Sequence, residues 1–140
     1  MTKSPLTSAV DLHKALAHPV RLRILAMLRR GELCVCQMTA VLDLAASTVS
    51  AHLTELKRAG LLGERKQGRW GNYRLSEEEA ARAHLEPAWK AIARDPRIEA
   101  DARLLRELRR VSVEELCRVD LNLGRLGIRR PAVAEARARQ

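Results

Sequence analysis

The chain has 140 residues, enough for one domain with extensions but too few for two independent enzyme lobes. Its 26 lysine and arginine residues outnumber its 17 acidic residues, which leaves a formal net charge of +9 at pH 7. This excess favours a polyanionic partner, with nucleic acid first and an anionic membrane surface second. Aromatic residues make up 2% of the chain, so few side chains could stack on the bases of single-stranded nucleic acid.

The N-terminal residues have neither the apolar core of a secretory signal nor the Arg/Ser-rich pattern of a transit peptide. No apolar run reaches membrane-spanning length, so we expect a cytoplasmic protein without a membrane partner. Three cysteines, an odd number, do not form a disulfide framework. In a reducing compartment, closely spaced thiols more often serve metal binding or redox chemistry.

Apolar residues recur at helical spacing in the first part of the chain. The pattern predicts an N-terminal arm over residues 1–9, then a short helix that ends before Pro19. A second helix should begin at Pro19 and close at Gly31, because proline suits a helix start and glycine a helix end.

The next two helices form a helix-turn-helix candidate. Residues 34–42 are predicted to be helical, and residues 43–46 make a tight turn into a helix over 47–60. Val49, Leu53 and Leu56 place one apolar stripe on this second helix.

The helical spacing of apolar residues ends after Gly63. Residues 64–75 have β-formers on both sides of a glycine-centred turn and predict a basic β-hairpin. A helix-turn-helix followed by such a hairpin is the plan of a winged helix. The expected fold is therefore mainly α with a small β-hairpin: a dimeric winged helix-turn-helix with an extra C-terminal helical segment.

The remaining residues predict further helices and a tail. A helix should run from about residue 77 to 93 with a kink or break at Pro87, followed by an amphipathic segment over 98–110. A capping box at Ser112 opens a short helix that contains Cys117. We expect a winged-helix domain over 10–94, a helical extension over 95–121, and a loose basic tail over 122–140.

The second helix of a helix-turn-helix enters the major groove, and the wing contacts phosphates. A dimer would span two half-sites, with the first helix and the helix over 77–93 as its interface. The alternative is that the polar residues form a solvated face. The candidate DNA-contacting residues are Ser47, Thr48, Ser50, His52, Lys57, Arg65, Lys66 and Arg69.

Two thiols, Cys34 and Cys36, stand at the start of the first of these helices. Neighbouring residues of an ideal helix are about 100° apart, so these two side chains would point roughly 160° away from each other. Sulfurs that bind one soft ion at about 2.3 Å must approach to roughly 4 Å or less, so the first turn must unwind or never form. Ligand binding would then deform the helix that supports the recognition helix.

The segments LAHPVRLRIL, ELCVC, STVSAHLTELKRAGLL and ERKQGRWGNYRLS together resemble the ArsR family of metal-responsive winged-helix repressors, and within it the arsenical-resistance repressors. The resemblance covers residues 12–92. It implies a homodimer that sits on double-stranded operator DNA and leaves when arsenic(III) or antimony(III) binds the cysteines. Similar members often carry a third cysteine three residues after the second, where this chain has Thr39.

Soft thiolates select soft acceptors, and a tetrahedral zinc site would want more ligands than the sequence offers. The candidate ligands are Cys34 and Cys36, with Cys117 as an optional third from its own or the partner subunit. Cys117 could equally pack as a small hydrophobic residue.

Other functions use the same thiols. A DNA-binding repressor could respond to thiol oxidation, to persulfidation, or to cadmium or lead. An enzyme, a small thiol oxidoreductase, would require a βαβ pattern around the cysteines, which the sequence lacks. A purely architectural DNA-binding protein would not depend on its cysteines. We therefore expect a regulator rather than an enzyme, with no catalytic residues and no catalytic cofactor.

Overall fold

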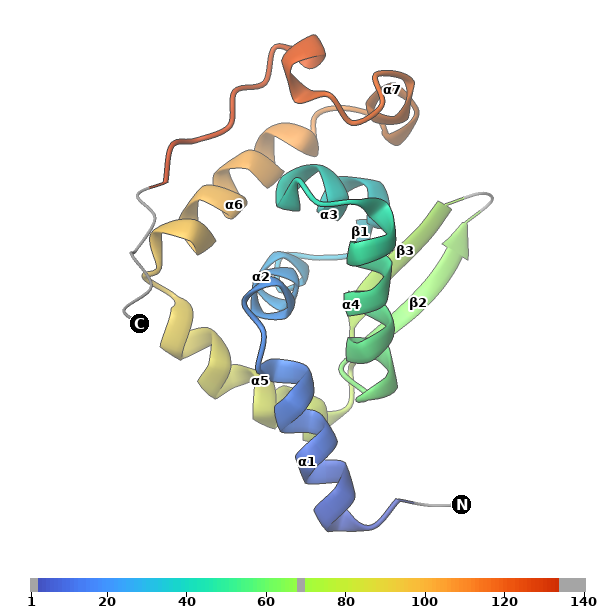
Figure 1. The fold of residues 1–140 in the computed structure, drawn as a ribbon, viewed down its shortest axis with the longest axis vertical. Coiled ribbons are helices and arrows are strands. Elements are labelled where there is room, and N and C mark those ends of the chain that lie inside the picture. The colour runs from blue at the N-terminus through green and yellow to red at the C-terminus, as the bar shows by residue number, and fades with distance from the viewer. Residues whose placement is uncertain (1–2, 68–69, 134–140) are drawn as a thin grey trace.

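The computed structural model describes residues 3–67 and 70–133. Most of these residues are helical, and Figure 1 shows the small sheet at one side of the helices, beyond α4. This confirms the prediction of a mainly helical fold with a β-hairpin. The elements, in chain order, are α1 (Pro5–Leu16), α2 (Pro19–Leu28), β1 (Leu33–Cys34), α3 (Val35–Leu42), α4 (Ala46–Arg58), β2 (Leu62–Gln67), β3 (Trp70–Leu75), α5 (Glu79–Ile92), α6 (Pro96–Leu108), α7 (Val113–Arg118) and the 3₁₀ turn η1 (Leu123–Leu126).

Helices α3 and α4 form the predicted helix-turn-helix. Asp43 ends α3 with a left-handed backbone at φ 54°, which turns the chain sharply toward α4. Val49, Leu53 and Leu56 are fully buried, as their spacing on α4 predicted. One face of α4 is thereby fixed to the core and the opposite face is left to solvent.

The sheet has a third strand that the sequence pattern does not reveal. Its order is β1-β3-β2, antiparallel throughout, and β1 pairs Leu33 with Tyr73 and Cys34 with Asn72. Two residues are too few to show a strand period, so local sequence could not predict this strand. The pairing holds Cys34 in an extended backbone conformation, and α3 begins one residue later than predicted.

The C-terminal extension belongs to the folded core. Helix α6 packs along α2 and α3 (Figure 1), and its Leu104, Leu105 and Leu108 are buried there. Arg23 on α2 donates two hydrogen bonds, of 2.7 and 2.8 Å, to the buried carboxylate of Asp101 on α6. A bidentate guanidinium–carboxylate pair fixes orientation as well as distance.

The N-terminus differs from the predicted arm over residues 1–9. Helix α1 already begins at Pro5, because the Ser4 hydroxyl accepts a hydrogen bond from the Thr7 amide at 3.1 Å and proline favours the first helical position. Ser4 and Pro5 are sufficient to start the helix, and the predicted boundary between arm and helix lies five residues too far along the chain.

Of the kink or break predicted at Pro87, the break does not occur. Pro87 lies inside α5, which continues to Ile92. Proline removes one backbone hydrogen bond, but Leu85 and Trp89 are buried on either side of it and hold both halves of the helix against the core.

The loose tail predicted over 122–140 is partly wrong. Residues 123–126 form η1, Leu123 is buried, and Arg130 bonds to the end of α3. Composition suggested disorder because Gly, Pro, Ala and Arg dominate this segment, but a buried leucine and one guanidinium anchor it. Residues 134–140 lie outside the described part of the chain. Among the described helices, none is long and apolar enough to cross a membrane.

Candidate thiol site and nucleic-acid interface

The three cysteines come from three different elements. Cys34 ends β1 and is the N-cap of α3, Cys36 lies in the first turn of α3, and Cys117 lies in α7. The sulfur atoms of Cys36 and Cys117 are 3.4 Å apart, although 81 residues separate them in sequence. The tertiary fold thus brings together thiols that the sequence could only suggest as partners.

The predicted opposition of Cys34 and Cys36 is wrong, because Cys34 is not helical. Its backbone is extended, at φ −74° and ψ 147°, so the helical spacing of about 100° does not apply to this pair. The two thiols interact through their side chains. No unwinding of α3 is needed to bring them to one side.

The start of α3 is held by polar contacts around the thiols. The Gln37 side-chain oxygen accepts a hydrogen bond from the Cys34 amide at 2.9 Å, as the third helical residue does in a capping box. Cys34 itself is 2% exposed, whereas Cys36 and Cys117 are half-buried. A small reagent therefore meets Cys36 and Cys117 before Cys34.

The close thiols shift each other's acidity in opposite directions. The side-chain hydrogen bond from Cys36 lowers the pKa of Cys34 to about 6, helped by backbone amides at the start of α3 and opposed by burial. The neighbouring Cys34 sulfur raises the pKa of Cys36, and burial and Cys117 act in the same direction. Cys34 therefore loses its proton before Cys36 does.

Residues 3–67 and 70–133 contain no group of three or more His, Cys, Asp or Glu side chains arranged to hold a metal ion. The Cys36–Cys117 separation nevertheless lies within the roughly 4 Å that two sulfurs on one soft ion require. Cys36 and Cys117 by themselves are a pair of adjacent thiols, one fewer than such a group of three requires. The cluster is a set of reduced, adjacent sulfurs rather than a complete metal centre.

The predicted base-contacting residues are divided between exposed and half-buried positions. Ser47, Thr48 and Ser50 are exposed on the first two turns of α4. His52 is half-buried: its Nδ1 accepts a hydrogen bond from the Arg21 side chain at 3.1 Å, and its ring lies 4.4 Å from that of His18. This contact ties α4 to α2 and does not support the prediction that His52 faces DNA.

The predicted phosphate contacts are also partly engaged within the chain. Lys57 pairs with Glu64 at 2.8 Å, and Arg65 bonds to both carboxylate oxygens of Glu32 at 3.0 and 3.1 Å. Lys66 on the wing strand is exposed. Arg69 lies outside the described residues.

The wing is connected directly to the thiol site. Strand β3 pairs with Cys34, and strand β2 carries Arg65, which bonds to Glu32 two residues before Cys34. Sequence reasoning missed Glu32 and Gln37, whose roles depend on partners that lie close to them only after folding. A displacement at Cys34 would therefore reach the wing through one strand pair and one ion pair.

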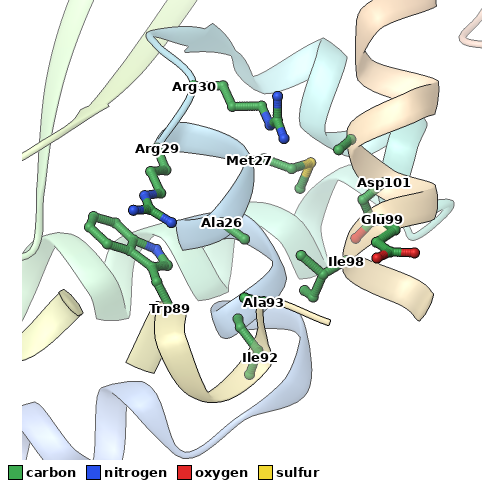
Figure 2. Close-up of a pocket in the computed structure, with 11 residues that line it drawn as sticks. Ala26, Met27, Arg29, Arg30, Trp89, Ile92, Ala93, Ile98, Glu99 and Asp101 are labelled. Atoms are coloured by element: carbon green, nitrogen blue, oxygen red, sulfur yellow. The ribbon is translucent and has the colours of Figure 1, made fainter. Parts of the chain in front are cut away.

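A separate cavity of about 140 Å³ lies between α2, α5 and α6, and no cysteine lines it (Figure 2). The Arg29 guanidinium lies over the Trp89 ring at 4.8 Å from its centroid, a cation–π contact. Trp89 is buried, and the cavity lies outside the thiol site.

Comparison with known proteins agrees with this architecture. Residues 18–63 match the family model described as bacterial regulatory protein, arsR family. The chain is 45% identical over 83 residues to the arsenical resistance operon repressor of Escherichia coli K12, across 59% of this chain and 65% of that protein. It is 40% identical over 80 residues to the arsenical resistance operon repressor of Bacillus subtilis 168, across 56% of this chain and 76% of that protein.

A similar solved structure is reduced HlyU from Vibrio cholerae N16961, with a TM-score of 0.55, 38% identity, and coverage of 61% of this chain and 88% of that one. The chain thus covers slightly less than two thirds of the length of the E. coli repressor. The named relatives are regulators of transcription, which agrees with the prediction that the chain is not an enzyme. The predicted family is confirmed: the chain belongs to the ArsR family of bacterial regulatory proteins.

Proposed function

We propose that this chain is a cytoplasmic transcriptional repressor that binds double-stranded operator DNA as a homodimer. It releases the DNA when arsenic(III) or antimony(III) binds the thiolates of Cys34 and Cys36. The observation that carries the proposal is the position of the thiols at the first turn of α3, beside a strand that pairs with the wing. The names of the E. coli and B. subtilis relatives support the choice of metalloid.

The surface of α4 suits DNA. Its exposed hydroxyls Ser47, Thr48 and Ser50 can reach base edges or phosphates, and Lys66 extends the basic surface onto the wing. A net charge of +9 adds long-range attraction to the duplex, so binding should weaken steeply with salt.

Metalloid binding can act on this surface without unfolding α3. Bonds from one ion to the sulfurs of Cys34 and Cys36 change the position of Cys34, whose backbone pairs with Asn72 of the wing. The effector shifts the equilibrium by its difference in affinity for the DNA-bound and free conformations. The Glu32–Arg65 ion pair carries the same displacement to the other wing strand.

The homodimer is supported by an apolar surface around α1. Leu6 and Val10, one turn apart, are 76% and 44% exposed. Beyond the end of α1 lies an apolar groove that includes Leu16, Leu22 and Ile98. Exposed apolar residues together with an apolar groove are typical of an association surface.

The test is fluorescence anisotropy of labelled duplexes that tile the DNA immediately upstream of the protein's own reading frame. Reduced protein is titrated onto them, then arsenite, antimonite, zinc and cadmium are added in parallel. We expect arsenite and antimonite to release the protein from the upstream duplex. Binding to a shuffled duplex, which should not change on their addition, measures the background.

The matched control is the Cys34→Ser/Cys36→Ser double variant. We expect it to bind the duplex with wild-type affinity and to stay bound at every arsenite concentration. Release of that variant by arsenite would show that these thiols are not needed for the response. If arsenite does not release the wild-type protein, the metalloid is not the effector.

A second candidate is a repressor switched by thiol oxidation. The 3.4 Å separation of Cys36 and Cys117 favours it, because two thiols in contact can lose two protons and two electrons to form a disulfide. Hydrogen peroxide would accept the electrons and leave as water. If peroxide releases the protein from DNA, dithiothreitol restores binding, and arsenite has no effect, then the effector is the oxidant and not the metalloid.

A further inference from the structure

We propose that Cys117, from the C-terminal extension of the same subunit, supplies the third thiolate of the metalloid site. This inference rests on the proposed function of Cys34 and Cys36. It assigns the C-terminal extension, which lies beyond the residues matched by the family model, a direct part in effector binding.

The contact between the sulfurs of Cys36 and Cys117 carries the proposal. Cys36 is central: its sulfur is 3.4 Å from that of Cys117, and its side chain also interacts with that of Cys34. The cluster therefore forms within one chain and does not require a cysteine of a partner subunit.

The third ligand cannot come from α3 itself. Thr39, one turn after Cys36, is buried, and its hydroxyl donates a hydrogen bond to the Val35 carbonyl at 2.7 Å. This hydroxyl is a hard oxygen donor already used within the helix, and soft acceptors prefer thiolates. Cys117 faces the same first turn from α7, so the extension provides the thiol that α3 lacks.

The structure holds α7 against this turn by contacts independent of the thiols. Leu116, next to Cys117, is 1% exposed, and the Ser112 hydroxyl caps α7 by accepting a hydrogen bond from the Glu115 amide at 3.1 Å. Further along, the Arg130 guanidinium donates hydrogen bonds to the carbonyls of Ala40 and Val41 at the other end of α3. The extension is thus fixed at both ends of α3, and little ordering is needed to present Cys117.

The chemistry selects among arsenicals. Arsenite, As(OH)₃, exchanges its three hydroxyl groups for three thiols and releases three water molecules, with no change of oxidation state. Monomethylarsenite, CH₃As(OH)₂, has two exchangeable hydroxyl groups and can bond to two thiols. A three-thiol site therefore favours inorganic arsenite. A two-thiol site leaves the third hydroxyl group of arsenite unexchanged.

The experiment compares wild type with Cys117→Ser and with a matched control, Arg118→Ala, which changes an exposed neighbour in α7. Binding of arsenite and of monomethylarsenite to the full chain is followed by the sulfur-to-arsenic absorption in the ultraviolet. We expect Cys117→Ser to lose roughly tenfold or more in arsenite affinity and to bind monomethylarsenite nearly as wild type does. Arg118→Ala should match wild type with both probes.

A measurement on the unchanged protein guards against a folding defect in the variant. Alkylation of each cysteine by iodoacetamide is timed by mass spectrometry, with and without saturating arsenite. Arsenite should protect Cys117 along with Cys34 and Cys36, and monomethylarsenite should protect two of the three.

Equal arsenite affinity in Cys117→Ser, or unprotected Cys117 at saturation, would overturn the third-ligand assignment and leave the two-thiol repressor intact. Failure of wild type to bind arsenite at all would instead overturn the proposed function on which the assignment rests.

Discussion

At the scale of single residues, the placement of Cys34 controls the chemistry of the cluster. The residue lies at a helix N-cap, where backbone amides stabilise negative charge, and beside a second thiol that donates to it. The thiolate, not the thiol, binds soft ions. The cluster is therefore charged for ligand binding at neutral pH while Cys36 keeps its proton until a ligand displaces it.

This environment predicts an acid limit to metalloid binding. Because the pKa of Cys34 is lowered to about 6, the thiolate is present above that pH and is lost as the pH falls through it. We expect the thiolate absorption in the ultraviolet to rise with a midpoint near pH 6, and the association rate of arsenite to follow it. The same titration of Cys34→Ser should lack this step; its persistence would assign the low pKa to another group.

A second residue-scale prediction concerns the bond between Arg23 and Asp101. Both side chains are largely buried, and removal of the carboxylate leaves a guanidinium without its partner. We expect Asp101→Ala to lower the free energy of unfolding by about 2 to 3 kcal/mol in urea denaturation. Glu99→Ala, an exposed change on the same helix, should stay within about 0.5 kcal/mol of wild type.

At the scale of elements, α3 is held by the segment that follows α7. Helix C-termini leave carbonyls without internal partners, and Arg130 supplies hydrogen bonds to two of them. We expect Arg130→Ala to lower the free energy of unfolding by about 1 to 2 kcal/mol. Arg129→Ala is the matched control, and an equal loss in both variants would show that charge, not the contact with α3, stabilises this segment.

The wing and recognition helix give a prediction about DNA. Lys66 is exposed on β2, whereas its neighbour Arg65 is engaged with Glu32. Lys66→Ala should weaken binding of the upstream duplex equally with and without arsenite, and reduce the slope of log affinity against log salt by about 1 per protomer. Arg106→Ala, an exposed change on α6, should leave the slope unchanged. A wild-type slope in Lys66→Ala would remove this residue from the interface.

At the scale of the whole molecule, the proposed dimer depends on α1. Val10→Asp places a charge in the exposed apolar stripe and should shift the protein toward monomer in sedimentation equilibrium, with weaker binding of the full duplex. Ser8→Asp adds the same charge on the opposite side of α1 and serves as control. If Val10→Asp remains dimeric, the interface lies elsewhere.

The sequence by itself determined the elements whose patterns are local. Helix periodicity, the stripe of Val49, Leu53 and Leu56, and the glycine-centred hairpin were sufficient for a winged helix, because burial of one face imposes a period on the chain. The segment ELCVC identified the thiols and the family because its residues are adjacent in the chain and can be recognised without knowledge of the fold.

Only the tertiary structure decided how the site is assembled. The pairing of β1 with β3 removed Cys34 from the helix, and the packing of α7 on α3 brought Cys117 to Cys36. The inward turn of His52 likewise depends on Arg21, a residue of another helix. These contacts join residues far apart in sequence, and neither spacing nor composition encodes them, because each depends on where a second element packs.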